Sequence, residues 1–206
     1  MLYHHGIILN RAKKTYERSL KDDDESFVSI MLSAMALECY INDFTHSASQ
    51  ELFQINIKPL RDLSYVLNVL ESSRSTLISK IESIHFLLTG SEIDKGSMHI
   101  QDLVMLIRLR NELVHRKPES HGDWGVKDKS EFEPHKFVKY FSDRGIIDRP
   151  PSNAPPVWSQ FINQPIVAKW AYNTVVHNIK DIIRILPPSH FAQIESVCTG
   201  SVQEIK

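Results

Sequence analysis

The sequence is poor in cysteine and glycine, and it has almost no net charge. Its 206 residues include only two cysteines, Cys39 and Cys198, and seven glycines. Two isolated cysteines form neither a disulfide framework nor a paired zinc-ligand spacing, so the sequence favours a reducing compartment. Because the formal net charge is −1, any contact with nucleic acid depends on a local basic patch.

Long apolar runs are also missing. No stretch approaches the roughly 20 apolar residues that cross a bilayer. The first residues lack the order of charge followed by an apolar run that marks a signal peptide. We therefore expect a soluble, cytoplasmic protein that does not contact a membrane. His4 and His5 are adjacent, but no third ligand is evident, and we expect neither a metal nor a cofactor.

The remaining composition is that of a globular protein, with 42% hydrophobic and 24% charged residues. Apolar residues recur at spacings of three and four, and no segment alternates apolar and polar residues for long. The sequence therefore predicts an all-α fold, a bundle of about five helices. The predicted helices cover approximately residues 9–20, 25–53, 60–88 (one or two helices), 99–116 and 165–186.

The region between Pro118 and Pro165 differs in composition, because seven of the ten prolines lie there. We interpret residues 118–164 as an irregular insertion with one short helix at about 135–141. Irregular segments of this length are often functional. Residues 187–206 form a tail that is either a short docked helix or disordered. The length suits one core, so we expect residues 1–206 to form a single domain.

Two charged residues fall on apolar helical stripes. Glu38 has Met31, Ala34, Met35 and Ile41 at helical spacings, and Arg110 is flanked in the same way by leucines, isoleucine and valine. A buried charge is normally paired, and the planar guanidinium of arginine suits a carboxylate. We therefore predict an ion pair between Glu38 and Arg110. The alternative is that one helix is rotated at a surface, or that Arg110 extends outward to solvent.

A polar group lies on the other side of the fourth predicted helix. His115 follows Asn111 by four residues and Glu112 by three, and Arg108 stands seven residues before it. Histidine has an unperturbed pKa near 6.5, which makes His115 a candidate acid or base. Most surface histidines have no such role, and the spacing alone does not establish one.

The segment Leu109-Arg110-Asn111-Glu112-Leu113-Val114-His115 resembles the signature of HEPN domains, an arginine followed after four to six residues by a histidine. A polar residue commonly follows that arginine, as Asn111 does here. The stretch around Glu38 and Asn42 also resembles the second helix of many such proteins. The resemblance covers roughly residues 25–116 well and the final helix loosely.

The resemblance implies a helical bundle that forms a homodimer, in which the arginine and histidine of both subunits share one cleft. Many HEPN proteins are metal-independent endoribonucleases, often toxins or effectors of anti-phage defence. It then implies a catalytic role for Arg110, Asn111 and His115, with structural support from Glu38 and Asn42. Contacts to RNA phosphates would come from a small basic patch, Arg108, Arg116 and Lys117.

The sequence also departs from the family pattern. Where HEPN toxins paired with nucleotidyltransferases usually carry a modified tyrosine, two residues after the histidine, this chain has Lys117. The insertion has no counterpart in the pattern. Two alternatives remain beside the nuclease: a non-catalytic module that binds RNA, a nucleotide or a protein, and a helical protein that matches the motif by chance. Candidate partners beside a second copy are RNA and an antitoxin or another partner protein.

Overall fold

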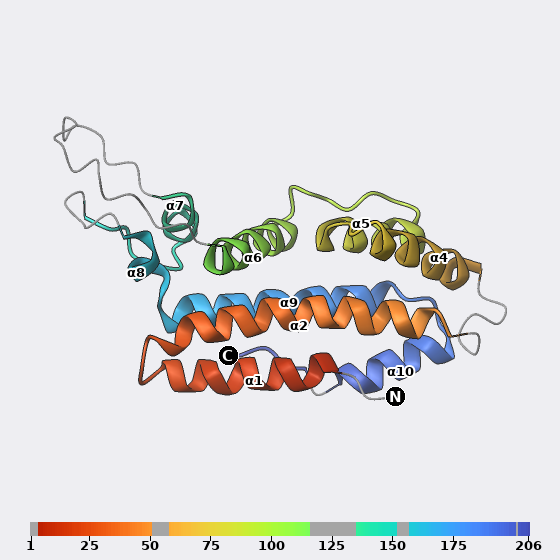
Figure 1. The fold of residues 1–206 in the computed structure, drawn as a ribbon, viewed down its shortest axis with the longest axis horizontal. Helices are drawn as coiled ribbons and strands as arrows, with labels where there is room; N and C mark the ends of the chain where they lie inside the picture. The colour runs from red at the N-terminus through yellow and green to blue at the C-terminus, as the bar shows by residue number, and fades with distance from the viewer. Residues whose placement is uncertain (1–3, 51–57, 116–134, 152–156, 201) are drawn as a thin grey trace.

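The computed structural model describes residues 4–50, 58–115, 135–151, 157–200 and 202–206, and all regular structure in these segments is helical (Figure 1). The all-α prediction is therefore confirmed. The helices are α1 (His4–Ser19), α2 (Glu25–Ala48), α4 (Lys58–Ser72), α5 (Leu77–Thr89), α6 (Met98–Val114), α7 (Lys136–Asp143), α8 (Trp158–Ile162), α9 (Pro165–Ile185) and α10 (His190–Thr199).

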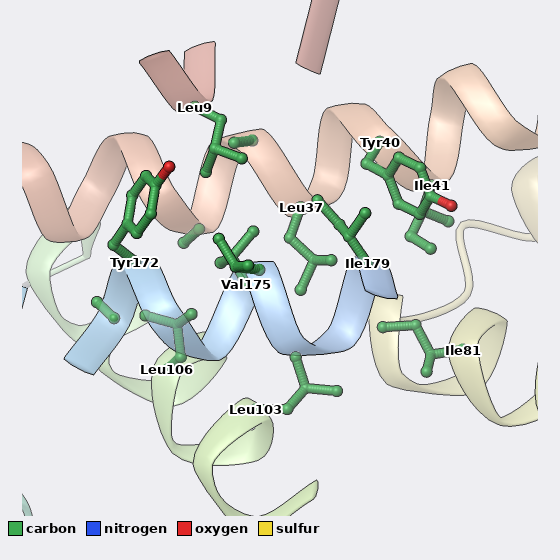
Figure 2. Packing of buried hydrophobic residues seen from close by; sticks show 14 of the residues in the cluster. Leu9, Leu37, Tyr40, Ile41, Ile81, Leu103, Leu106, Tyr172, Val175 and Ile179 are labelled. Atoms are coloured by element: carbon green, nitrogen blue, oxygen red, sulfur yellow. The ribbon is translucent and has the colours of Figure 1, made fainter. Parts of the chain in front are cut away.

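The helix α2 is at the centre of the arrangement, because it contacts α1, α4, α5, α6 and α9. Figure 1 shows α1, α2 and α9 side by side, with α4, α5 and α6 along the other side of the α2–α9 pair and α7 and α8 at one end. In Figure 2, Leu37 of α2 lies against Val175 and Ile179 of α9, and Leu106 extends toward α9 from α6. The hydrophobic core is thus continuous across three layers of helices.

Local sequence explains where several helices begin and end. The Thr76 hydroxyl accepts the backbone N–H of Ser79 and caps the start of α5, and Gly90 ends the same helix with a left-handed φ of 73°. Pro165 occupies the first turn of α9, where the missing N–H is no loss. The start of α1 is capped by another helix. The Asp43 carboxylate of α2 accepts hydrogen bonds from the backbone N–H groups of His4 and His5.

The structure has nine helices among its described residues, where the sequence pattern predicts about five. The predicted third region is two helices, separated near Arg74, whose φ is 55°. The insertion contains the expected short helix as α7 and a second one, α8, which the pattern did not predict. Of the two alternatives for the tail, the docked helix is observed: α10 packs its buried Phe191 against Phe44 of α2 at 5.2 Å between ring centroids.

One helix in the described part of the chain, α2, is long and apolar enough to cross a bilayer by length and composition alone. Half of its most apolar window is buried inside the protein, as in the core helix of a soluble protein. This is compatible with the expected soluble protein, and the cytoplasmic location stays a prediction.

The central position of α2 predicts that changes on its buried face lower the free energy of unfolding. Replacing Leu37, which is fully buried, with alanine is expected to lower the free energy of unfolding by about 2–5 kcal/mol, because it removes apolar contacts and leaves a cavity. The matched control is Met35→Ala on the same helix, since Met35 is 45% exposed. Urea unfolding followed by circular dichroism measures both. Equal losses for the two variants would contradict the assignment of the buried face.

Candidate functional site

The predicted ion pair between α2 and α6 is present. Arg110 Nη2 donates to Glu38 Oε2, and Nη1 of the same guanidinium donates to Asn111 Oδ1 at 2.9 Å. The two acceptors come from different helices, and both lie in reach of one planar group. Because the guanidinium is rigid and its donors have fixed directions, two such contacts restrict its orientation.

The pair lies at the edge of the core, so the predicted burial of the two charges is wrong. The Arg110 side chain is 29% exposed and that of Glu38 is 47% exposed. The buried face of α2 runs through Leu37 and Ile41, and Met35 lies outside it. Apolar residues occur on nearly every side of α2, so spacing alone did not define which side faces the core.

His115 lies at the end of α6, where its backbone N–H donates to Asn111 O at 3.0 Å. Its side chain is exposed and makes no hydrogen bond or ion pair with the described residues. His115 itself follows the last helical residue, Val114, with a non-helical φ of −110°. The described contacts do not bring its ring to Arg110.

The described part of the insertion packs against another side of α6. Tyr140 of α7 donates its hydroxyl to Asp102 Oδ1 at 2.7 Å, and Arg144 Nη1 lies 3.3 Å from the same oxygen. Asp102 and Asn111 are nine residues apart, which corresponds to opposite sides of an ideal helix, about 180°. Asn111 is exposed, and Lys136 of α7 donates to Oε2 of the neighbouring Glu112 at 3.2 Å.

The contacts of α7 also constrain the phenol of Tyr140. Burial raises the pKa of Tyr140 well above its ordinary range, and the hydrogen bond to Asp102 raises it further. The guanidinium of Arg144 lies 4.4 Å from the centre of the same ring. The phenol is therefore a hydrogen-bond donor that ties the insertion to α6, and not a group that titrates near neutral pH.

The other residues predicted for the site are not gathered around Arg110. Asn42 is exposed one turn beyond Glu38, and it makes no hydrogen bond with Arg110 in the described structure. Arg108 is exposed on α6, about 160° around an ideal helix from Arg110. Arg116 and Lys117 lie outside the described residues. Of the predicted site residues that the structure describes, Glu38 and Asn111 are the two that contact Arg110.

A second polar cluster next to this site was missed by sequence reasoning. His5 is fully buried, and its Nδ1 lies 2.9 Å from Asp43 Oδ2, while its ring meets Tyr40 edge-on at 5.0 Å. The one available signal was the i to i+4 spacing of Cys39 and Asp43 on α2, which places thiol and carboxylate on one side. Their partner His5 is distant in sequence, so no local pattern indicated it.

Cys39 is the nucleophile nearest to Glu38 in sequence, and its surroundings suppress its reactivity. Burial, followed by the neighbouring Asp43 and Glu38 carboxylates, raises the pKa of the Cys39 thiol to about 11. Sγ lies 3.9 Å from Asp43 Oδ2, to which the thiol donates. At neutral pH the group is a neutral thiol, so it is not suited to nucleophilic catalysis.

Metal ligands are not clustered in the described ranges, where no group of three or more histidine, cysteine, aspartate or glutamate side chains is placed to hold a metal ion. Comparisons of the chain with protein-family models, with curated proteins and with solved structures gave no match. Function is therefore inferred from the residues themselves and from the resemblance of their pattern.

The ion pair predicts a measurable coupling between Glu38 and Arg110. A double-mutant cycle with Glu38→Gln and Arg110→Gln is expected to give about 0.5–1 kcal/mol in the free energy of unfolding, since the pair is partly exposed and screened. The Lys95–Glu82 pair is the control, because Lys95 is 71% exposed and a smaller coupling is expected. A coupling no larger than the control value would show that the contact does not orient Arg110 in solution.

The raised pKa of the Cys39 thiol predicts an unusual dependence of its alkylation rate on pH. In a Cys198→Ser background, the rate of reaction with iodoacetamide is expected to keep rising beyond pH 9, because the pKa is raised to about 11. Asp43→Asn removes the carboxylate with the larger effect on this pKa and is expected to shift the profile to lower pH. A plateau near the ordinary thiol pKa of about 8.5 would contradict the raised value.

Proposed function

We propose that this chain is a HEPN-type endoribonuclease that cuts RNA without a metal ion, using Arg110, Asn111 and His115. The observation that carries the proposal is the arrangement of Arg110. Its guanidinium is oriented by Glu38 and Asn111 and yet stays partly exposed beside the exposed Asn111. An oriented and accessible cation is what a developing phosphate charge requires.

The chemistry follows from RNA itself, whose 2′-hydroxyl can attack the adjacent phosphate. His115 acts as the base that removes the hydroxyl proton, which contributes about 10²–10⁴-fold in rate. Arg110 stabilises the negative charge of the pentacoordinate phosphorus. The attack forms a 2′,3′-cyclic phosphate and releases the 5′-oxygen of the next nucleotide, which must receive a proton.

The proton that the leaving 5′-oxygen must receive gives a reason for a homodimer. A single His115 that has just taken the hydroxyl proton lies on the wrong side of the phosphorus to protonate the leaving oxygen. His115 of a second copy supplies this acid if the two α6 ends meet across a two-fold axis. The exposed Val114, at 50% exposure beside His115, provides apolar surface for such a contact.

The same proposal includes the residues that would contact RNA and the biological role of the protein. Arg108 is exposed, and together with Arg116 and Lys117 it would bind RNA phosphates. Asn42 would support the site from α2. The resemblance to HEPN toxins suggests a cytoplasmic toxin or anti-phage effector that is held in check by an antitoxin or another partner protein.

One observation favours the second candidate, a non-catalytic module that binds RNA, a nucleotide or a protein. Both terminal nitrogens of Arg110 already have acceptors within the chain, and the Glu38 carboxylate offsets its charge. In that case Arg110 holds α2 against α6, and His115 is an ordinary surface residue.

RNA cleavage in EDTA decides between the two. Wild-type protein is expected to release products with cyclic phosphate ends from an unstructured RNA, and His115→Ala and Arg110→Ala are each expected to lower the rate by about 10²-fold or more. The matched controls are His46→Ala and Arg61→Ala, which replace exposed residues on α2 and α4.

The variants are compared only where circular dichroism shows that they fold. Loss of cleavage in His115→Ala with retention in His46→Ala supports the nuclease. No cleavage by wild type across a broad RNA panel, combined with unfolding of Arg110→Ala and a stable His115→Ala, overturns the nuclease and favours the module.

A further inference from the structure

One side of α6 faces the insertion through four side chains: Gln101, Met105, Arg108 and Glu112. Their spacings of four, three and four place them in one stripe along an ideal helix. The helix α7 contacts both ends of this stripe. Arg144 Nη2 donates to Gln101 Oε1 at 2.7 Å, and Lys136 Nζ donates to Glu112 Oε2 at 3.2 Å. The insertion therefore lies along the stripe on α6.

A pocket of about 240 Å³ opens between α5, α6 and α7 at the middle of this stripe, with Arg108 and Tyr140 in its lining. Its apolar lining comes from four side chains: Ile78, Ile100, Val104 and Met105. Sites for drug-sized ligands begin at about 300 Å³, so this pocket suits a smaller group. A single nucleobase, with an apolar face and a polar edge, is such a group.

The charges in the lining leave Arg108 available. Lys95 also lines the pocket, but its Nζ lies 2.9 Å from Glu82 Oε1, so these two charges offset each other. Arg108 is exposed and makes no hydrogen bond or ion pair with the described residues. The five N–H donors of its guanidinium can therefore bind a phosphate or the polar edge of a base.

Lys136 of the insertion supplies a second cation close to His115. Its partner Glu112 directly follows Asn111 and stands three residues before His115. The backbone N–H of His115 donates to Asn111 O, so these residues lie within one turn of each other. The Lys136 side chain is 58% exposed and that of Glu112 is 36% exposed, and such a solvated pair contributes little to stability. Lys136 can therefore turn from Glu112 to a phosphate at little cost in free energy.

Asn111 connects the stripe to the site around Arg110. On an ideal helix the exposed Asn111 lies about 60° around the axis from Arg108 and about 100° from Arg110. Arg108 stands seven residues before His115, which is about 10.5 Å along the axis. A chain of phosphates that begins at Arg110 and Asn111 can thus continue past Lys136 to Arg108 over the exposed surface of α6.

We propose that the surface between α6 and α7 binds single-stranded RNA next to the cleavage residues, an inference that rests on the proposed function because it takes RNA as the ligand. Lys136 and Arg108 bind two phosphates of the strand, and one base enters the pocket beside Met105 and Tyr140. A base within a duplex is paired and stacked, so only an unpaired strand can place a base in this pocket.

Fluorescence anisotropy with the full chain in EDTA tests the base-binding pocket. The probe is a short unstructured RNA with 2′-O-methyl groups, which cannot attack phosphorus, so the probe is not cut. The comparisons are an oligomer of equal length without bases and the probe annealed to its complement. Both are expected to bind about tenfold weaker, since neither can place a base in the pocket. Equally tight binding of the oligomer without bases overturns the pocket, and equally tight binding of the duplex overturns the preference for single strands.

Arg108→Gln and Lys136→Gln test the phosphate contacts. Each is expected to weaken binding of the probe and to reduce the slope of log affinity against log salt by about 0.7, the value for one phosphate of a single strand. The matched controls are Arg11→Gln and Lys14→Gln, which replace exposed cations of α1 on the far side of the α2–α9 pair from α6 (Figure 1). Slopes that fall no further than in the controls overturn the phosphate contacts.

The results separate this inference from the proposed nuclease. If wild type cuts RNA in EDTA but Arg108→Gln and Lys136→Gln bind the probe as tightly as wild type, the nuclease stands and the α6–α7 surface is overturned. If wild type binds the probe through Arg108 and Lys136 but cuts no RNA, the surface stands and the nuclease is overturned in favour of an RNA-binding module. Absence of both binding and cleavage overturns both.

Discussion

The packing of α2 against α9 is the interaction on which the other contacts depend. These two helices are far apart in the sequence, and each is buried along most of one side, α2 through Leu37 and Ile41 and α9 through Val175 and Ile179. Once they are paired, α1 can cover α2, and α6 can lie across α9 (Figure 1). The burial of apolar surface supplies the main free energy of such a bundle. Polar contacts then select among arrangements that bury similar areas.

The Glu38–Arg110 pair is a polar contact of that kind. Removing two ions fully from water costs several kcal/mol per ion, and a contact at the edge of the core avoids most of this. The exposed fractions of 47% and 29% leave both charges partly hydrated. The pair therefore adds little to stability but fixes how α6 is rotated against α2, because a rotated helix would separate the two groups. Asp43 has a similar function for α1, since one carboxylate oxygen accepts both N–H groups at its start.

The sequence predicted the helices well where their ends carry strong local signals. Pro165 marks the start of α9, and the predicted helix at about 99–116 begins one residue after the observed start of α6 and ends two residues after its observed end. The contact of Glu38 with Arg110 was also predictable, because two opposite charges on apolar stripes require partners. How deeply this pair is buried was not predictable. The helix α2 has small or apolar residues on almost every side, and only the neighbouring helices determine which side is buried. The short helix α8 and the His5–Asp43 contact depend on distant segments, so no local pattern reveals them.

The same contact that orients Arg110 also limits what it can bind. A guanidinium has five N–H donors, and Glu38 and Asn111 use two of them. Three donors remain for a phosphate, but the neighbouring carboxylate repels that phosphate. Water screens this repulsion because nearly half of the Glu38 side chain is exposed. A single Arg110 can therefore orient a bound phosphate, but it attracts that phosphate only weakly. In the proposed dimer two guanidiniums and two imidazoles would share one cleft, but each guanidinium keeps its own Glu38, so the second copy would add a second oriented donor group and not a stronger positive field.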